Sequence, residues 1–330
     1  MKLDELAKLA GVSRTTVSYV VNGKAKQYRV SDKTIEKVQS LIKKYDFKPN
    51  AMAAGLRAGK TNTIGLIIPD FENMSYARIA HQLEQKFREK GYQLLIACSN
   101  DNPNNEMACA KHLFQRKIDA LIVSTSLPAD NLFYQQSEVP VFGFDRKIFG
   151  DNVINVLSDD RNDAYGLAQD LFKQQSFNKV LFFGALAELP TSKARELGFR
   201  QALTEKQLKQ VEFLYSEQYH RESAAKTFEQ WLATNTLPDA LFVTSLTLLQ
   251  GIFQALLRQY KSIPQQLQIA TFGDHEMLDL LTNKSVCAVQ DHQKIAEKLL
   301  HLVLERLKRK SGAEKLNMSN NVLRYLVYHR

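Results

Sequence analysis

The N-terminal segment carries hydrophobic residues at helical spacing, which predicts three short helices. The first covers residues 3–10 and is followed by a tight turn. The second begins after Ser13, a natural N-cap, and runs to about Val21. The third begins after Ser31 and ends near Tyr45. Two short helices joined by a tight turn, with a third that braces them, form a helix-turn-helix module.

The second helix of this module has a polar outer face. Its inward positions are valines, whereas its outward positions are Arg14, Thr15, Ser18 and Tyr19. In a helix-turn-helix module this helix enters the major groove of DNA. A three-helix bundle without a DNA function would explain the hydrophobic pattern equally well, but it would not explain this polar face.

From residue 62 onward, short apolar runs alternate with amphipathic segments. The runs predict strands over Ile64–Ile68, Gln93–Cys98, Ala120–Ser124, Val139–Phe144, Val153–Val156, Lys179–Gly184, Glu212–Tyr215, Ala240–Thr244, Ile269–Phe272 and Val286–Gln290. The helices predicted between them include Tyr76–Lys90, Glu106–Gln115, Asp163–Gln174, Ser192–Leu203, Arg221–Ala233 and Gln293–Lys308. This alternation is typical of parallel sheets with right-handed crossovers. About ten strands are too many for one such sheet, so we expect two doubly wound α/β lobes with a ligand between them.

Composition places the chain among globular proteins. Its 330 residues suggest about two domains, and 44% hydrophobic with 24% charged residues are ordinary values. No stretch approaches the roughly 18–20 apolar residues that span a bilayer, and the start lacks the basic flank and apolar run of a secretory signal. Three widely spaced cysteines cannot form a disulfide framework. We therefore expect a cytoplasmic protein with reduced thiols.

The positive charge is concentrated at the N-terminus. Residues 1–60 contain 13 Lys and Arg against 5 Asp and Glu, whereas the rest of the chain contains 31 against 30. An asymmetry of this size points to a polyanion, either a nucleic acid or an acidic membrane surface. Together with the polar face of the second helix, the charge favours DNA.

A family resemblance rests on the same segment. Residues 10–18, AGVSRTTVS, resemble the signature of the lactose-repressor family of bacterial transcription regulators. The lengthened loop over residues 19–31 is similar to that of the fructose-responsive members of this family. The resemblance covers the whole chain and is strongest in residues 1–65. It implies a sequence-specific DNA-binding regulator with an effector domain of the type I periplasmic sugar-binding fold.

The resemblance implies two groups of DNA contacts. Arg14, Thr15 and Tyr19 would read bases, because a guanidinium fork matches guanine and hydroxyl groups contact several base edges. Residues that would hold the module on phosphates are Ser13, Thr16, Asn22, Lys26, Tyr28 and Arg29.

A hinge is expected over residues 47–61, between a DNA-binding domain (1–46) and an effector domain (62–330). Leu56 matches the family leucine that wedges into the minor groove at the operator centre and bends the duplex. Gly55 costs a helix about 1 kcal/mol relative to Ala, so we expect the hinge to fold only on DNA. The sequence GLRAGKT within it resembles a phosphate-binding loop, but the first glycine is missing and a strand follows instead of a helix.

The sequence carries no enzyme signature. No glycine fingerprint for a dinucleotide follows a predicted strand, and the seven histidines lack the spacing of a zinc site. Asp274 and His275 are neighbours of a kind that arises by chance in a loop at a strand end. We therefore expect neither catalysis, nor a cofactor, nor a metal.

The resemblance further implies an effector site at the ends of the strands. Asp145 and Arg146 follow a predicted strand, where the family places an Asp-Arg pair on the ligand. Residues 192–199 reproduce the family pattern Ser-x-x-Arg-x-x-Gly-Phe, whose arginine, Arg195 here, clamps the effector. The other implied contacts are Ser124, Ser245, Asp274, Gln290 and Arg324.

One departure concerns the charge of the ligand. Sugar-binding members often carry Asn-Asp where this chain has Ser245-Leu246, so a carboxylate is missing. Arg146, Arg195 and Arg324 then favour an anionic ligand, because guanidinium forks match phosphate. Together with the resemblance to the fructose-responsive members, this implies a phosphorylated fructose, fructose 1-phosphate, whose binding releases the DNA. The alternative is a purely structural role, in which these arginines only pair with carboxylates across the lobes.

The expected partners are a double-stranded operator, the phosphorylated sugar and a second copy of the chain. Two subunits would place two recognition helices on a pseudo-palindromic operator. The C-terminal tail lacks the leucine heptads of a coiled-coil tetramer, which leaves a homodimer or a homotetramer built another way. Two alternatives stay open: a regulator of the same fold that senses an unphosphorylated sugar or a purine, and a sugar-binding transport component.

Overall fold

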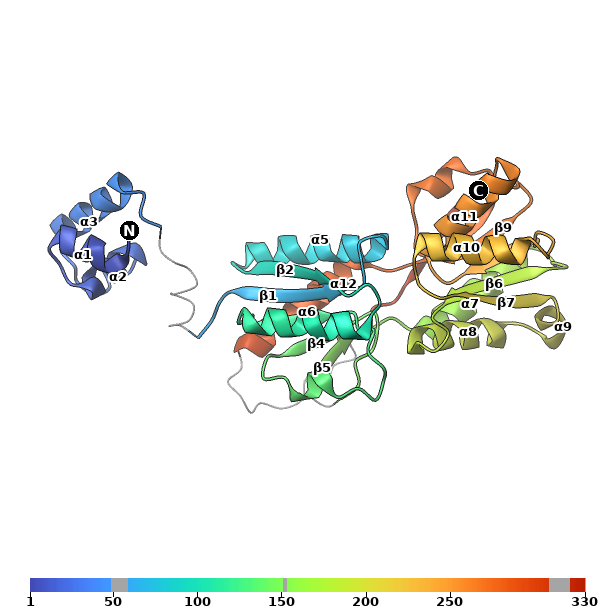
Figure 1. The fold of residues 1–330 in the computed structure, drawn as a ribbon, viewed down its shortest axis with the longest axis horizontal. Coiled ribbons are helices and arrows are strands. Elements are labelled where there is room, and N and C mark those ends of the chain that lie inside the picture. Colours follow the sequence, from blue (N-terminus) through green and yellow to red (C-terminus); the bar gives the residue numbers. More distant parts are fainter. Residues whose placement is uncertain (49–58, 151–152, 309–320, 330) are drawn as a thin grey trace. The chain divides into compact units, whose positions relative to one another are not determined.

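The computed structural model describes residues 1–48, 59–150, 153–308 and 321–329. Contacts divide the chain into two compact units, Met1–Thr61 and Asn62–Arg330, whose helices and strands are labelled in Figure 1. Across the described ranges, no helix combines the length and the apolar character needed to cross a membrane.

The N-terminal unit contains three helices, α1 (Leu3–Ala10), α2 (Arg14–Val21) and α3 (Asp32–Lys44). The predicted N-caps are present, because the hydroxyls of Ser13 and Ser31 each accept a hydrogen bond from the amide three residues later, at 3.1 and 3.4 Å. These bonds satisfy amides that have no partner within the helix. The core consists of Leu6, Ala7, Ala10, Val17, Val20, Ala25, Val38 and Phe47. The helix-turn-helix prediction is confirmed.

The first lobe of the larger unit is a parallel sheet with the strand order β2-β1-β3-β4-β5. Its strands are β1 (Thr63–Ile68), β2 (Gln93–Cys98), β3 (Ala120–Val123), β4 (Val141–Phe144) and β5 (Val153–Val156). The helices that cover its two faces are α5 (Met74–Glu89) with α12 (His292–Lys308) on one side and α6 (Pro103–Gln115) on the other. A short 3-10 helix, η1, spans Phe133–Gln136. Because β1 lies between β2 and β3, the winding direction reverses there, and a crevice opens at the carboxyl ends of these strands.

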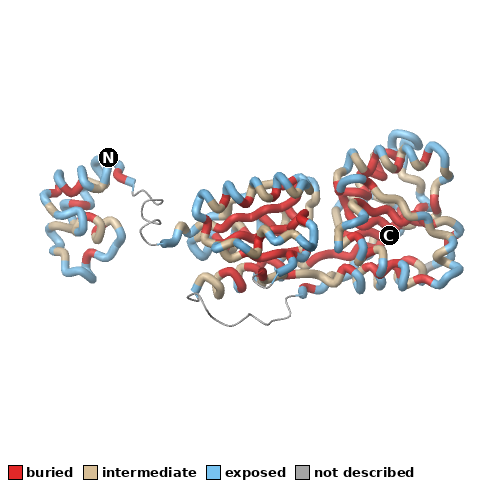
Figure 2. Tube along the Cα trace, turned by 60° about the horizontal axis from the view of Figure 1, so that its bottom comes forward, coloured by how far each residue is buried: buried red, intermediate tan, exposed pale blue. Residues whose placement is uncertain are grey.

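The second lobe repeats this order in β7-β6-β8-β9-β10 and adds an antiparallel edge strand, β11. Its strands are β6 (Val180–Ala185), β7 (Val211–Ser216), β8 (Ala240–Val243), β9 (Gln268–Phe272), β10 (Ser285–Val289) and β11 (Tyr325–His329). Its helices are α7 (Asp160–Gln174) and α8 (Pro190–Ala202) on one face, α10 (Arg221–Leu232) and α11 (Leu246–Tyr260) on the other, and the short α9 (Glu205–Leu208) and η2 (Glu276–Leu280). In both lobes the buried residues follow the strands (Figure 2). The prediction of two doubly wound lobes is confirmed.

Close packing of α7 against α8 depends on a glycine. A Cβ atom added to Gly198 in α8 would lie 2.0 Å from the carbonyl oxygen of Arg161 in α7. Only a residue without a side chain allows this approach. Gly166, which lies within α7, has open space where a Cβ would be.

The chain passes between the lobes three times, after β5, after β10 and before β11. An isolated parallel bridge pairs Leu157 in the first passage with Asn321 in the third. The second and third passages lead to Gln290 and Arg324, which line the space between the lobes. The first leads to Asp160, which pairs with Arg324. The crossings therefore place residues far apart in the sequence around one space.

Candidate functional site

The outer face of α2 presents the residues predicted to read bases. Arg14 and Thr15 are exposed and Tyr19 is partly exposed. Arg14 Nε lies 3.2 Å from Asp4 Oδ1, but the two side chains are 55% and 57% exposed. Water screens such a surface pair, so it contributes little stability, and the guanidinium remains accessible to another acceptor. Ser18, on the same helix, accepts a hydrogen bond from Asn22.

The predicted phosphate contacts lie at the two ends of α2 and in the loop that follows. Ser13 and Thr16 are at the N-terminus, where unpaired amides and the helix dipole suit an anion. Asn22 caps the C-terminus by donating to the Ser18 carbonyl at 2.8 Å. The exposed loop residues are Lys26, Tyr28 and Arg29. Leu56 and most of the predicted hinge lie outside the described residues.

A stacked pair of tyrosines connects this loop to the recognition helix. The rings of Tyr19 and Tyr28 lie parallel, with centroids 3.8 Å apart and an interplanar angle of 6°. Stacking of this kind contributes about 0.5–1.5 kcal/mol beyond the buried area. Tyr28 therefore holds the ring of Tyr19 in place, a relation that helical spacing did not indicate.

A cavity of ≈650 Å³, counting its open mouth, lies between the two lobes. Six of the residues implied as effector contacts line it: Asp145, Arg146, Arg195, Ser245, Gln290 and Arg324. Ser124 lies behind the lining, where its hydroxyl donates to the hydroxyl of Tyr76 at 3.1 Å.

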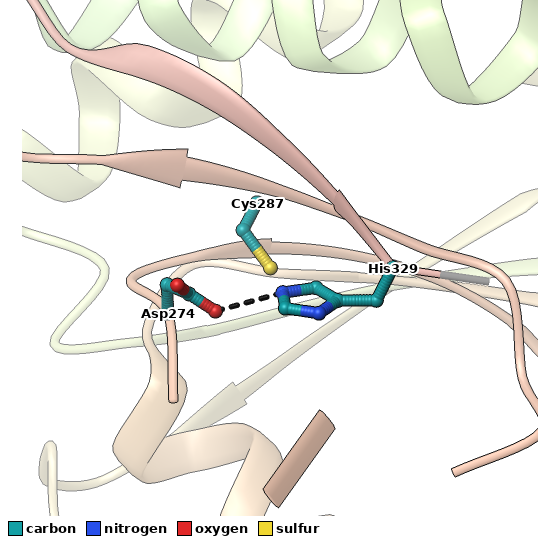
Figure 3. Close-up of side chains that lie close together, drawn as sticks. All are labelled: Asp274, Cys287 and His329. Atoms are coloured by element: carbon teal, nitrogen blue, oxygen red, sulfur yellow. Dashed lines mark hydrogen bonds and ion pairs between the residues drawn. The ribbon is translucent and has the colours of Figure 1, made fainter. Parts of the chain in front are cut away.

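Asp274 does not line the cavity, contrary to the expectation from the resemblance. Gly273, with φ of +90°, turns the chain after β9. The carboxylate of Asp274 then lies against β11, with its Oδ1 2.8 Å from His329 Nε2 (Figure 3). A direct contact of Asp274 with an effector therefore has no support in this geometry.

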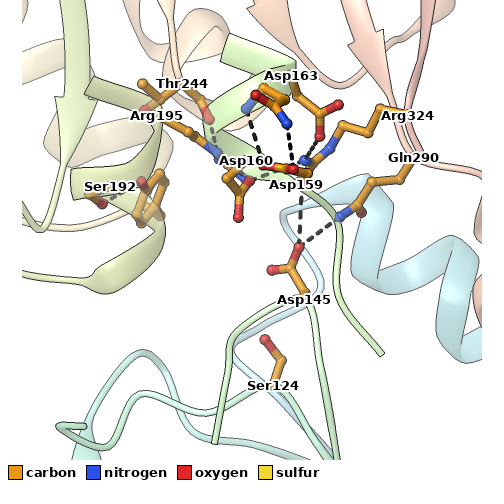
Figure 4. A network of polar contacts seen from close by, with 12 residues as sticks. Ser124, Asp145, Asp159, Asp160, Asp163, Ser192, Arg195, Thr244, Gln290 and Arg324 are labelled. Carbon is orange, nitrogen blue, oxygen red and sulfur yellow. Dashed lines mark hydrogen bonds and ion pairs between the residues drawn. The ribbon is translucent and has the colours of Figure 1, made fainter. Parts of the chain in front are cut away.

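Arg195 and Arg324, which line the cavity, share the carboxylate of Asp160. Nε and Nη2 of Arg195 lie 2.9 and 2.8 Å from Asp160 Oδ1, and Nη1 of Arg324 lies 3.1 Å from the same oxygen. Arg195 also donates to the Thr244 carbonyl at 2.6 Å, and Arg324 to Asp163 at 2.5 Å. Figure 4 shows both guanidinium groups converging on the N-terminus of α7. Each guanidinium is thus held by protein groups on more than one side.

Asp145, which follows β4 of the first lobe, is hydrogen-bonded to a residue in one of the passages between the lobes. Its carboxylate accepts hydrogen bonds from the Tyr76 hydroxyl at 2.8 Å and from Gln290 Nε2 at 2.7 Å. Burial raises the pKa of Asp145, but Arg195, Arg324 and Arg146 outweigh it, and the net pKa lies below the usual value. Asp145 therefore carries a negative charge at neutral pH.

Arg146 is the cationic group of the first lobe. Its Nη1 lies 2.5 Å from Asp101 Oδ1, and both side chains are buried. Burial lowers the pKa of Arg146, but Tyr76 and Asp101 raise it well above its ordinary value. The guanidinium also lies over the ring of Tyr219, 5.8 Å from its centroid. Arginines from both lobes therefore face one cavity, each paired with a carboxylate.

Sequence reasoning missed the carboxylates that neutralise these arginines. Asp101 follows β2, and Asp70, another lining residue, follows β1. Asp145 was implied by the family resemblance, whereas a search for polar residues just after each predicted strand would have found Asp70 and Asp101 as well. Asp160 and Asp163 begin α7, where acidic residues are common for capping alone. No sequence signal separates that structural use from pairing with the arginines of the cavity.

A partly buried histidine, His292, lies next to this network. Burial and the charge of Arg78 lower the pKa of His292 to about 4, although Asp291 and Asp145 act against the shift. Its Nε2 has no hydrogen-bond partner among the described residues. His292 is therefore neutral at physiological pH.

Comparisons with known proteins agree with both units. Residues 2–50 match the family of bacterial regulatory proteins, lacI family, and residues 170–324 match the periplasmic binding protein-like domain. The chain is 53% identical over 310 residues to the catabolite repressor/activator of Salmonella typhimurium, covering 93% of this chain and 92% of that protein. It is 45% identical over 307 residues to the fructose operon regulatory protein of Vibrio cholerae, covering 92% and 93%. The structure of the Cra transcriptional dual regulator from Pseudomonas putida, in complex with fructose 1-phosphate, matches with a TM-score of 0.71 at 35% identity, covering 82% of this chain and 99% of that one.

Proposed function

The chain belongs to the lacI family of bacterial regulatory proteins, and we propose that it binds a pseudo-palindromic operator as a homodimer in the cytoplasm and releases it when fructose 1-phosphate enters the cavity between its lobes. Regulators of this family act by binding DNA, and the chain is a transcription regulator of carbon metabolism, not an enzyme. The observation that carries the effector proposal is the set of three guanidinium groups that line one cavity. A relative with a matching fold holds a sugar phosphate.

The phosphate of the effector competes with carboxylates that already occupy the arginines. A dianionic phosphate offers more acceptor oxygens than a carboxylate and matches guanidinium forks bidentately. Arg146 is held by Asp101 of the first lobe, and Arg195 by Asp160 at the start of the second. Asp145 is the carboxylate placed to accept sugar hydroxyls, because it already accepts two hydrogen bonds from neutral donors.

Release of the operator requires that the effector prefer one arrangement of the lobes. A ligand shifts an equilibrium only by its differential affinity for the two states. An effector that contacts Arg146 and Arg195 together prefers the arrangement in which both are within reach. The hinge, which folds on DNA in this proposal, transmits the difference to the recognition helices.

Leu56 is proposed to wedge into the minor groove at the operator centre. Side chains of this type unstack a base step and bend the duplex. Replacement by alanine is expected to weaken operator binding while leaving effector affinity unchanged, measured by fluorescence anisotropy and calorimetry. Equal operator affinity of Leu56→Ala and the native chain would remove the wedge from the proposal.

Fluorescence anisotropy on a pseudo-palindromic operator at physiological salt tests the proposal as a whole. We expect specific affinity on the order of 10⁻⁸–10⁻¹¹ M that collapses with fructose 1-phosphate and persists with fructose or a purine. Collapse with either control compound would refute the phosphorylated effector. Affinity that is weak and independent of sequence across a panel of operators would refute the recognition helix. Sedimentation of the complex distinguishes the dimer from a tetramer.

A further inference from the structure

Three side chains with metal-binding atoms meet in the second lobe, outside the lining of the effector cavity. They are Asp274, Cys287 and His329. One ligand atom from each, a carboxylate oxygen, the thiol sulfur and an imidazole nitrogen, lie within 4.8 Å of one another. Figure 3 shows the sulfur and the carboxylate on the same side of the imidazole ring.

Strand register brings these residues together. Cys287 in β10 pairs with Val327 of the antiparallel β11. His329 lies two residues further along β11, so its side chain emerges on the same face as a diagonal neighbour of Cys287. Asp274 comes just after β9, which runs parallel to β10. The cluster is thus built largely on sheet strands, which hold ligands more rigidly than loops do.

A further carboxylate orients the imidazole. His329 Nδ1 lies 2.8 Å from Asp279 Oδ1, while Nε2 faces Asp274. Metal-bound histidines almost always donate their other N–H to a carboxylate or carbonyl, which fixes the tautomer and turns the free nitrogen toward the ion. Asp279 is placed to do this, and it leaves Nε2 for the metal.

The donor types suit a zinc ion, and the ligand atoms, which lie within 4.8 Å of one another, are near the spacing that zinc requires. Tetrahedral zinc binds S, N and O ligands at about 2.0–2.3 Å, which separates ligand atoms by roughly 3.3–3.8 Å. The distance between Asp274 Oδ1 and His329 Nε2, 2.8 Å, must open by less than 1 Å to reach this range. A thiolate with imidazole favours zinc over magnesium or calcium. The ion binds a thiolate and an imidazole lone pair, so binding releases the proton of the Cys287 thiol and any proton on Nε2 of His329.

We propose that Asp274, Cys287 and His329 bind a zinc ion, with Asp279 as the positioning residue and water in the fourth position. The ion ties the edge strand β11 to β10 and to the turn after β9 in the second lobe. Arg324, one of the arginines of the effector cavity, directly precedes β11. By fixing β11, zinc therefore also limits the movement of Arg324. This site does not depend on the identity of the effector.

Cobalt titration of the metal-free, untagged full chain tests the site. We expect one equivalent of Co²⁺ to give a thiolate-to-cobalt charge-transfer band and tetrahedral visible absorption, both abolished by one equivalent of Zn²⁺. The band is lost in Cys287→Ala and His329→Asn. It persists in the matched control Cys98→Ala/Cys109→Ala, which removes the other two thiols.

A positioning role for Asp279 has its own readout. In Asp279→Asn we expect the same band with an affinity about 10–100-fold lower, because the ligands remain while the imidazole is held less firmly. Titration of the native chain shows whether the metal binds through a thiolate, even if one of the variants fails to fold. Absence of a thiolate band in the native chain would overturn the site, as would a band that survives in Cys287→Ala.

Discussion

Replacement of Arg195 by methionine tests how far the network between the lobes depends on one guanidinium. The side chain is only 10% exposed, and two of its nitrogens lie within 2.9 Å of Asp160 Oδ1. Removing one partner of a buried ion pair costs about 3–5 kcal/mol, because the remaining charge stays desolvated. Arg324 is still 3.1 Å from the same oxygen. We therefore expect a loss near the lower limit, about 3 kcal/mol.

A double-mutant cycle separates the pair from general damage to the core. Methionine keeps the aliphatic volume of Arg195, and Asp160→Asn removes the opposite charge. The double variant lacks both charges, so no unpaired charge from this pair stays buried. Its loss in free energy of unfolding is therefore expected to be smaller than the sum of the two single losses by about 0.5–3 kcal/mol. Urea denaturation of the full chain, followed by circular dichroism, measures the three free energies of unfolding.

The same variant bears on the effector. Under conditions in which Arg195→Met is folded, we expect operator binding to be retained and the response to fructose 1-phosphate to be lost, as measured by anisotropy and by calorimetry of the sugar phosphate. Because Arg195 also stabilises the fold, loss of response counts only with the folded fraction measured alongside. A single-variant cost below about 1 kcal/mol, or additive single costs, would refute the argument from desolvation.

Three further outcomes follow from packing, burial and stacking. Gly198→Ala is expected to lower stability in thermal unfolding by about 1–3 kcal/mol through overpacking, whereas Gly166→Ala, with open space at its Cβ, raises it by about 0.5–1 kcal/mol; equal effects would contradict the packing. Burial lowers the pKa of His292 to about 4 from its ordinary value of 6.5. Between pH 6.5 and pH 4 the imidazole is therefore protonated in the unfolded chain but neutral in the folded chain. Stability is therefore complete above pH 6.5 and falls toward pH 4, by at most about 3 kcal/mol, and His292→Gln flattens this part of the profile measured by urea denaturation; an unchanged profile would speak against it. Tyr28→Ala is expected to weaken specific operator binding up to about tenfold by freeing the ring of Tyr19, while Tyr28→Phe keeps the stack; a larger loss in Tyr28→Phe would assign the effect to the hydroxyl.

Local sequence patterns were sufficient for most of the elements. The strands β1 to β10 were all predicted, because each is a short apolar run bounded by polar residues. Strand β11 was not, since Tyr325–His329 is largely exposed and becomes a strand by pairing with β10. Helix α11 was not among the predicted helices either. It is buried along most of its length, which removes the polar face that marks an amphipathic helix.

The sequence by itself determined the helix-turn-helix and the alternation of strands and helices, since spacing and caps are local properties. The family resemblance implied Arg146, Arg195 and Arg324, which line the cavity between the lobes. Only the tertiary structure decided how these arginines are held. Asp101 and Asp160, the carboxylates that neutralise Arg146 and Arg195, lie 45 and 35 residues away in the chain. The structure also turned Asp274 away from the cavity and toward His329 at the far end of the chain. Such pairings depend on which strand ends become neighbours when the sheets form, and no local pattern encodes that.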